Sequence, residues 1–451
     1  MRFLRLDENA RFSNKQIVVF LLPMFFEQLM MSGLNIADTF MVSNLGEIAV
    51  AGVALVSRID NFVKQFLLAL AQGGSVIMSQ YIGAKDEKLA RTSLKNNVRI
   101  VIIIGLIIMA VMVLLLPWIL NTLYGNAEKE VLDISLEYFN ITAFSYPLVA
   151  LYYSGSASFR AMGESKVPSV AAICMMIINL TLKYTFIFKM NMGVKGAALS
   201  TLIAMATVGT VMFIGLHAKR NKVRLEGFFR PQFEGENAGR ILKISVPNGI
   251  EQGMFQLGAL LIAGLVSGLG TAAIAADSIS RTICGLIHSF GSGFVAVMMM
   301  VIGQCMGAGR PDEAEFYTKH ILKINYLLTF FNVLIVFVLL KPLISLYDVS
   351  AQAQSYAFRI LLIYGIGSMF FYPTSFATAA ALRGAGDTKF VMLVASCSMF
   401  LFRIGAAYIF VYVFRLGILG PWIAMVSDWV IRGAVFAIRF KGGKWAKNKV
   451  I

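Results

Sequence analysis

The amino-acid sequence predicts an all-α polytopic membrane protein with twelve transmembrane helices. We expect these helices to form two six-helix lobes that are parallel repeats, related by a pseudo-two-fold axis along the membrane normal. Three observations predict this fold: an apolar composition, an alternation of basic and non-basic loops, and a duplication within the chain.

The composition is typical of a membrane protein. Hydrophobic residues make up 58% of the chain and charged residues 14%, whereas soluble domains carry about 25% charged residues. Nearly uncharged stretches such as Ile100–Leu120 and Ala198–Leu216 reach the roughly 20 residues that a helix needs to cross about 30 Å of hydrocarbon. The expected spans lie near residues 16–42, 48–82, 97–120, 134–159, 168–188, 196–217, 242–268, 271–306, 321–345, 353–382, 389–414 and 418–438.

The basic residues predict the orientation of the chain. The net charge is +16, and Lys and Arg concentrate in segments 2–15, 85–95, 160–166, 219–224, 383–389 and 439–449. Loops rich in Lys and Arg thus alternate with loops that contain few, and under the positive-inside rule the basic loops face the cytoplasm. We therefore expect both termini in the cytoplasm, the protein in the cell inner membrane, and no nucleic acid as a partner.

The four cysteines, Cys174, Cys284, Cys305 and Cys397, all fall in apolar segments and lack the spacing of metal ligands. We expect them to be small buried hydrophobic side chains. No catalytic triad, phosphate-binding loop or nucleotide fingerprint occurs in the sequence. We therefore expect no metal site, no cofactor and no enzymatic activity.

The chain repeats itself. A shift of 224 residues carries Pro23 onto Pro247 and Glu27 onto Glu251. A shift of 223 aligns the loop Arg160–Lys166 with the loop Arg383–Lys389. Internal repeats of this kind are the signature of a duplicated architecture. We expect an N-lobe at residues 1–218, a cytoplasmic linker at 219–241, a C-lobe at 242–438 and a basic cytoplasmic tail at 439–451.

Six spans in each repeat, an even number, make both halves enter the membrane from the same side. Parallel repeats suit a transporter whose two lobes rock around a site at their interface. A channel would need a selectivity filter, and no segment resembles one. We expect the transporter to act as a monomer in the lipid bilayer.

Several motifs resemble those of the MATE family of multidrug and toxic compound extrusion antiporters, over essentially the whole chain. They are the end of the first span, Asn35–Gly46, the two loops that begin at Arg160 and Arg383, and the tail Arg439–Trp445. The resemblance implies a two-lobed fold of twelve helices. It also implies export of organic cations driven by inward flow of H⁺ or Na⁺.

Charged residues inside a membrane need a partner or a function, because each one is costly there. Three acids have a basic residue four positions later on the same helix face, which favours structural ion pairs. These intramembrane pairs are Asp60 with Lys64, Asp277 with Arg281, and Asp428 with Arg432.

Asp38 is a candidate coupling-ion residue. It has no such neighbour, and its repeat position holds Ile262, so one lobe carries a carboxylate that the other lacks. In the DinF-type branch of the family, the matching aspartate belongs to a cation site with an asparagine and an aspartate on the fifth span. Here Asn179 is present, but Lys183 replaces that aspartate. We expect Lys183 either to pair with Asp38 or to extend to the outer membrane interface.

Glu27 and Glu251 each lie four residues after a proline that we expect to kink its helix, and neither has a basic neighbour on its own helix. In the NorM-type branch, a glutamate that matches Glu251 takes part in cation or substrate binding. Its partner aspartate corresponds to Tyr372 here, which favours H⁺ over Na⁺ as the coupling ion. We expect Glu251 at the coupling site, and Glu27 and Tyr372 as candidates for substrate binding or proton relay.

Two further polar residues fall in expected spans. His288 is either a proton relay or a hydrogen-bonded structural residue. Arg403 occupies the repeat position of Asn179, and we expect it to be an internal counter-ion to an acid of the C-lobe.

The predicted function is secondary active export: antiport of amphipathic, cationic organic compounds, such as drugs and toxins, against inward H⁺, with Na⁺ as the less favoured ion. The 24 Met and 35 Phe residues suit an adaptable pocket and cation–π contacts. The alternative is a flippase of lipid-linked saccharides with a similar fold, which requires a cationic cavity for pyrophosphate. A non-transporting scaffold or receptor is a second alternative.

Overall fold

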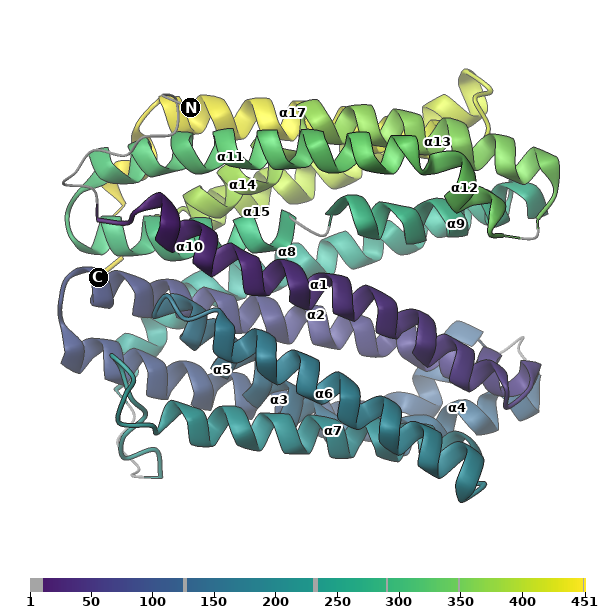
Figure 1. Ribbon diagram of the computed structural model, residues 1–451, viewed down its shortest axis with the longest axis horizontal. Coiled ribbons are helices and arrows are strands. Elements are labelled where there is room, and N and C mark those ends of the chain that lie inside the picture. The colour runs from purple at the N-terminus through teal and green to yellow at the C-terminus, as the bar shows by residue number, and fades with distance from the viewer. Residues whose placement is uncertain (1–10, 125–127, 230–233, 289–290, 348, 449) are drawn as a thin grey trace. The chain divides into compact units, whose positions relative to one another are not determined.

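A computed structural model of the 451-residue chain describes residues 11–124, 128–229, 234–288, 291–347, 349–448 and 450–451. The side chains of residues 29, 32–40, 43, 121, 123, 124 and 292 also lie outside this description. Within the described ranges the chain forms helices joined by short loops, and no strand occurs (Figure 1). The predicted all-α fold class is confirmed.

The first half of the chain contains helices α1 (Asn14–Ser43), α2 (Glu47–Gly83), α3 (Glu87–Tyr124), α4 (Lys129–Thr142), η2 (Ala143–Ser145), α5 (Tyr146–Ala161), α6 (Lys166–Tyr184), η3 (Thr185–Lys189) and α7 (Gly193–Leu216). The second half contains α8 (Gly235–Ser267), α9 (Thr271–Ile287), α10 (Gly291–Gly307), α11 (Pro311–Val338), α12 (Leu340–Ser345), α13 (Ala351–Phe370), α14 (Tyr372–Gly384), α15 (Thr388–Ser398), η5 (Met399–Gly405), α16 (Ala406–Tyr408), η6 (Ile409–Val413), α17 (Leu419–Lys441) and η7 (Lys444–Lys447).

Each of the twelve expected spans coincides with a helix or a series of helices. By length and apolar composition alone, seven of the described helices could cross a membrane, and an eighth is the bent pair α13 and α14. That pair bends by 48° where we expected one span at 353–382. Pro373, near the start of α14, explains the break, because proline has no N–H to donate to the preceding turn.

The expected span at 271–306 corresponds to two helices, α9, which ends at Ile287, and α10, which begins at Gly291, and residues 289–290 between them lie outside the described residues. Glycines at 285, 291 and 293 lower the helix propensity of this segment. The cysteine prediction holds for Cys284 and Cys305, which are buried, but is wrong for Cys174 and Cys397, which are exposed.

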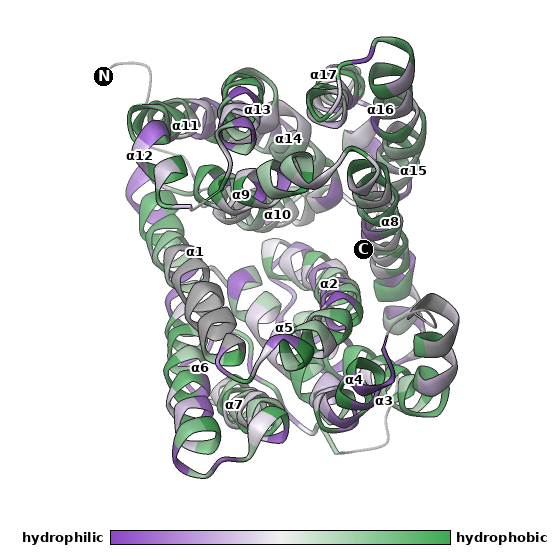
Figure 2. Cartoon of the chain, turned by 90° about the vertical axis from the view of Figure 1, so that its right-hand side faces the viewer, coloured by the Kyte–Doolittle hydropathy of each residue, from purple (hydrophilic) through white to green (hydrophobic). Residues whose placement is uncertain are grey.

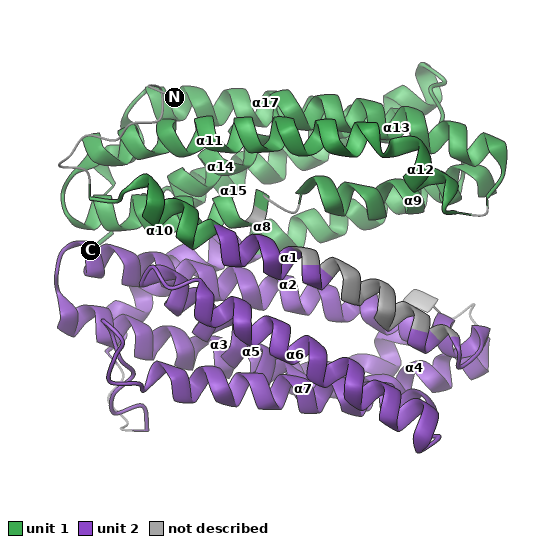
Figure 3. Cartoon of the chain, in the orientation of Figure 1, with its two compact units in different colours: residues 1–21, 250–451 green, residues 22–249 purple. Residues whose placement is uncertain are grey.

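The described helices divide into two compact units, coloured separately in Figure 3. Unit 1 comprises residues 1–21 and 250–451, and unit 2 comprises residues 22–249. These bounds differ from the expected lobes at α1 and α8. The start of α1 groups with unit 1 because Phe12 N–H donates to Tyr317 Oη (2.7 Å). The start of α8 groups with unit 2, where Ser245 Oγ donates to the Leu70 carbonyl (2.9 Å).

Unusual backbone conformations recur at the repeat shift in both halves, which confirms the duplication. The π-helical turns η3 and η6 begin 224 residues apart. Gly46 and Gly270, also 224 apart, have φ values of 96° and 95°, a region that glycine enters without steric cost. Gly163 and Gly386, 223 apart, both have φ of 87°. The repeated motifs therefore adopt the same local backbone geometry in both halves of the chain.

Each unit has its own hydrophobic core. In unit 2, α2, α3 and α5 pack together and α6 packs on α7, around buried residues such as Leu67 and Phe139. In unit 1, α10 packs on α14, and α13 packs on α9 and α17. Large apolar side chains also point outward, such as Leu114 and Trp118 of α3, and Figure 2 shows hydrophobic residues predominating along α8 and α15. Such exposed apolar surface suits contact with lipid.

Candidate functional site

A glutamate–arginine pair lies in unit 2. Glu27 of α1 accepts hydrogen bonds from Arg160 Nη2 through both carboxylate oxygens, each at 3.1 Å. Arg160 is in the last turn of α5. Ser169 Oγ of α6 donates to Oε2 of the same carboxylate (2.8 Å). Both oxygens of Glu27 therefore have partners.

The repeat places the same pair in unit 1. Glu251 of α8 forms an ion pair with Arg383 of α14, whose Nη2 donates to Glu251 Oε1. The Glu251 side chain is 4% exposed, against 15% for Glu27. Its second oxygen, Oε2, is buried and accepts no hydrogen bond from any described residue. At the shift of 223 that aligns the two loops, the counterpart of Ser169 is Met392, which has no hydroxyl to donate.

Glu27 and Glu251 have no basic neighbour on their own helices, as expected, but each has an ion-pair partner on another helix. The partners lie 133 and 132 residues away in the sequence, so only the packing of one helix end against another brings them together. The signal was present nevertheless, because the acid and the arginine are both duplicated at nearly the same shift. Two opposite charges retained together in both halves predict a contact between them.

Asp428 and Arg432 do not form the predicted ion pair. Arg432 Nε donates to Ser375 Oγ (2.9 Å), and its guanidinium lies over Phe376 at 4.6 Å. Asp428 accepts a hydrogen bond from Ser398 Oγ, and its Oδ2 has no partner among the described residues. The guanidinium of Arg432 turns to the serine and the aromatic ring instead of to its helix neighbour.

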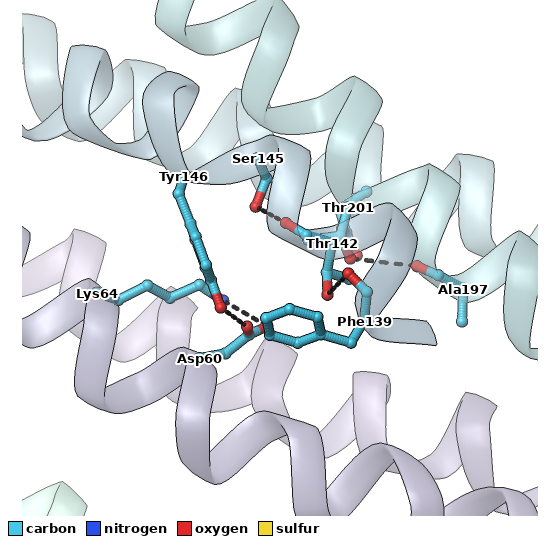
Figure 4. Close-up of polar contacts among 9 residues, drawn as sticks. Asp60, Lys64, Phe139, Thr142, Ser145, Tyr146, Ala197 and Thr201 are labelled. Carbon is cyan, nitrogen blue, oxygen red and sulfur yellow. Dashed lines mark hydrogen bonds and ion pairs between the residues drawn. The ribbon is translucent and has the colours of Figure 1, made fainter. Parts of the chain in front are cut away.

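The other two predicted pairs come together with additional partners. Lys64 Nζ lies 3.8 Å from Asp60 Oδ2, and Tyr146 Oη donates to Asp60 Oδ1 (2.6 Å), an arrangement visible in Figure 4. Arg281 Nε lies 2.6 Å from Asp277 Oδ2, and Trp422 Nε1 donates to Asp277 Oδ1 (3.1 Å). These aromatic donors come from distant segments, so helix spacing could not reveal them.

We predict that Tyr146→Phe lowers the free energy of unfolding by about 1.5–3 kcal/mol, the typical contribution of a hydrogen bond to a charged group. Tyr146 and Asp60 are both buried, so water cannot replace the lost donor. Denaturant unfolding of the purified protein, followed by tryptophan fluorescence, measures the change. Tyr412→Phe, at an exposed tyrosine, is the control and should leave stability unchanged; equal losses in both variants would contradict the assignment.

Lys183 lies deep inside unit 2, with only 1% of its surface exposed. Its ammonium group therefore does not extend to the surface of the unit, which argues against the interface alternative. One turn earlier on α6, Asn179 Nδ2 donates to Thr201 Oγ1 of α7 (3.2 Å). Asp38 belongs to α1, but its side chain lies outside the described residues, so the Asp38–Lys183 pair stays a prediction.

His288, Tyr364 and Tyr372 meet in an aromatic cluster of unit 1. His288 Nε2 and the Tyr364 hydroxyl share a hydrogen bond, and the rings of His288 and Tyr372 lie 4.2 Å apart. Arg403 Nη2 contacts Met425 Sδ at 2.8 Å and forms no ion pair with a described acid, so the predicted counter-ion contact is not formed. Within the described ranges, no group of three or more His, Cys, Asp or Glu side chains could hold a metal ion.

Comparison with known proteins identifies the family. The family model MatE matches residues 23–185 and again residues 247–409. The chain belongs to the MatE family. The two matched segments begin at Pro23 and Pro247, so the MatE family model finds the same duplication as the sequence repeat.

Similar MATE proteins include several described as multidrug resistance proteins. The probable multidrug resistance protein NorM of Thermotoga maritima is 26% identical over 445 residues, which are 97% of this chain and 94% of that protein. The NorM protein of Listeria monocytogenes serovar 1/2a is 26% identical over 95% of this chain and 94% of that protein. As a member of the MATE family, the chain is a multi-pass membrane transporter, and this family is not an enzyme class.

Solved MATE structures share the fold. An outward-facing multidrug resistance MATE family transporter of the MOP superfamily superimposes with a TM-score of 0.88 over 98% of both chains, at 21% identity. A MOP superfamily transporter from Pyrococcus furiosus superimposes with a TM-score of 0.89, also at 21% identity, over 96% of this chain and 97% of that one. The predicted MATE-like fold is confirmed, and transport is favoured over the scaffold or receptor alternative.

Proposed function

We propose that this protein is a secondary active exporter that exchanges amphipathic, cationic organic compounds for inward-moving H⁺ by alternating access. The observation that carries the proposal is the Glu251–Arg383 pair. A buried carboxylate with one oxygen held by an arginine, and the other accepting no hydrogen bond from the described residues, has a position for a proton. The multidrug resistance proteins among the relatives support the substrate class.

Protonation of Glu251 is the coupling step in this proposal. A proton on Oε2 removes the negative charge that holds Arg383, so the link between α8 and the end of α14 weakens. A ligand or proton shifts a conformational equilibrium only through its different affinity for the two states. Here the proton has a different affinity for the two states, because the charged ion pair stabilises one arrangement of α8 and α14 and the neutral acid does not.

The charges near Glu251 favour H⁺ over Na⁺. Arg383 already supplies a permanent positive charge at the carboxylate, and like charges repel strongly inside a low-dielectric interior. In unit 2, the buried ammonium of Lys183 has the same effect. We propose that Lys183 pairs with Asp38 beside Asn179, as a second proton-sensitive site. Glu27, Tyr372 and His288 remain candidates for substrate binding or proton relay.

We also propose an orientation and a membrane for the protein. The basic loops and both termini face the cytoplasm, and the protein lies in the cell inner membrane as a monomer. The N-lobe, linker, C-lobe and tail then follow the expected order along the chain. Its partners are the organic substrate, H⁺ and the lipid bilayer.

The test is accumulation of a fluorescent organic cation in everted membrane vesicles, with a proton or a sodium gradient imposed separately. We expect uptake with the proton gradient and its loss in Asp38→Asn. Uptake with sodium alone would overturn the argument from Lys183 and Arg383. No uptake with either gradient would favour the alternative function.

That alternative is a flippase of lipid-linked saccharides, and one observation favours it. Unit 1 buries Arg432 and directs Arg403 to the sulfur of Met425, and neither guanidinium lies within 4.0 Å of an acid in the described chain. Cationic groups of this kind could hold a pyrophosphate. Translocation of a fluorescent lipid-linked saccharide in proteoliposomes, lost in Arg403→Gln, would support the flippase.

A further inference from the structure

Unit 2 contains an open groove between α6 and α7, which run side by side (Figure 1). Its volume is about 640 Å³. One part of the groove is apolar and is lined by Val170, Cys174, Ile178, Val208 and Val211. The groove therefore has a long apolar wall, and its remaining part is polar.

The polar end of the groove is basic. Lys166, Arg220 and Lys222 line it, with Glu164 as the acid among them. None of these four side chains forms an ion pair or a hydrogen bond with a described residue, and the three basic ones are exposed. Helix α6 begins at Lys166, so the positive end of its dipole adds to the same field. The end of the groove thus carries positive charge that no ion pair within the described ranges compensates.

In the second half of the chain, the repeat counterparts of two groove residues have different surroundings. At the shift of 224, Asn221 corresponds to Trp445, which is buried and stacks on Phe440 with ring centroids 4.8 Å apart. At the shift of 223, Glu164 corresponds to Asp387, which pairs with Arg439 at 2.8 Å. Unit 1 therefore covers these positions with its own tail and neutralises the acid. In unit 2, Asn221 and Glu164 line the open groove instead, so the open groove is not a necessary result of the repeat.

We propose that this groove binds an anionic phospholipid of the cytoplasmic leaflet. The phosphate lies against Lys166, Arg220 and Lys222, and one acyl chain lies along Val170 and Val211. Basic pockets between helices on the cytoplasmic side suit anionic lipid head groups, and the apolar wall excludes water from the chain. The inference rests on the proposed cytoplasmic position of the basic loops and is independent of the coupling ion and of the exported compound.

The experiment uses Cys174, the exposed cysteine inside the groove. The full chain with Cys397→Ala is placed in nanodiscs of phosphatidylglycerol or of phosphatidylcholine, and the rate of Cys174 alkylation by a membrane-permeant maleimide is measured. Each basic residue near an anionic lipid contributes about a fivefold preference. We therefore expect alkylation to be slower by about tenfold or more in phosphatidylglycerol.

Three variants locate the effect. The triple change Lys166→Gln, Arg220→Gln and Lys222→Gln should abolish the protection of Cys174. A matched triple change at exposed lysines outside the groove, Lys15→Gln, Lys88→Gln and Lys441→Gln, should retain it. Val211→Trp, which fills the groove without changing its charge, should lower the amount of phosphatidylglycerol that copurifies in native mass spectrometry. Folding of every variant is checked by monodisperse size-exclusion elution.

Three results would overturn the proposal. Equal alkylation in the two lipids would show that the groove does not select the anionic head group. Protection by millimolar inorganic phosphate in phosphatidylcholine would show a site for a soluble anion instead. Protection by a fluorescent organic cation, with no effect of lipid charge, would assign the groove to the exported compound. Failure of proton-driven export would leave this lipid measurement unaffected, so the two proposals are tested separately.

Discussion

Replacing Glu251 by glutamine is expected to lower proton-driven export strongly while the protein still folds. Glutamine has nearly the same shape and can still accept a hydrogen bond from Arg383, but it cannot gain or lose a proton. We expect a fall of about 5–150-fold in proton-driven uptake into everted vesicles, the range typical of a coupling free energy between two sites. The variant should also lose the dependence of export on pH, which a merely structural change would leave in place.

Glu27→Gln is the matched variant in the other half of the chain. Both oxygens of Glu27 have partners, Arg160 and Ser169, so no oxygen is open to a proton. We expect Glu27→Gln to keep the dependence of uptake on the proton gradient, with any loss of uptake confined to substrate binding. If the two variants lose export equally, the missing partner of Glu251 Oε2 is not what makes Glu251 the coupling residue. If only Glu27→Gln loses export, the assignment of the two glutamates is reversed.

Replacing Arg383 by methionine is expected to produce the largest loss of stability. The change leaves the Glu251 carboxylate, 4% exposed, inside the unit without a counter-ion. Removing one partner of a buried ion pair typically costs about 3–5 kcal/mol. Denaturant unfolding in detergent micelles, followed by tryptophan fluorescence, should show the loss as a lower midpoint at an unchanged slope.

The double variant Glu251→Gln with Arg383→Met distinguishes this cause from a general packing defect. It removes the buried charge together with its partner, so it should recover most of the lost stability. Arg160→Met should cost less than Arg383→Met, because Ser169 still donates to Glu27 and the carboxylate is more exposed. A double variant as unstable as Arg383→Met alone would refute the ion pair as the source of the stability.

Helix spacing explains which contacts could be predicted. Asp60 with Lys64 and Asp277 with Arg281 lie four residues apart on one helix, so one face brings them together in any packing. Asp428 and Arg432 have the same spacing, but Ser375 and Phe376 of α14 compete for the guanidinium. Spacing therefore predicts that two groups can meet, and tertiary contacts decide whether they do.

The glycine and proline positions show a similar division. Gly46 and Gly270 occupy equivalent positions in the duplicated motifs, and both adopt positive φ values. The boundary between α9 and α10 lies beside residues outside the described ranges, and a hydrophobic run gives no signal of it. Pro373 lies at the bend between α13 and α14, but proline within α1 and α8 does not end those helices, so proline alone did not show where a helix ends.

By itself, the sequence determined that this protein is an all-helical membrane protein of duplicated architecture and a member of a transporter family. Those properties depend on composition, on the length of apolar segments and on repeated motifs, which are local features of the chain. Only the tertiary structure decided that Glu27 meets Arg160, that Glu251 meets Arg383, and that one oxygen of Glu251 accepts no hydrogen bond within the described part of the chain. Such contacts depend on how helix ends more than 130 residues apart are packed, because a buried charge is stabilised by whatever group the fold brings beside it.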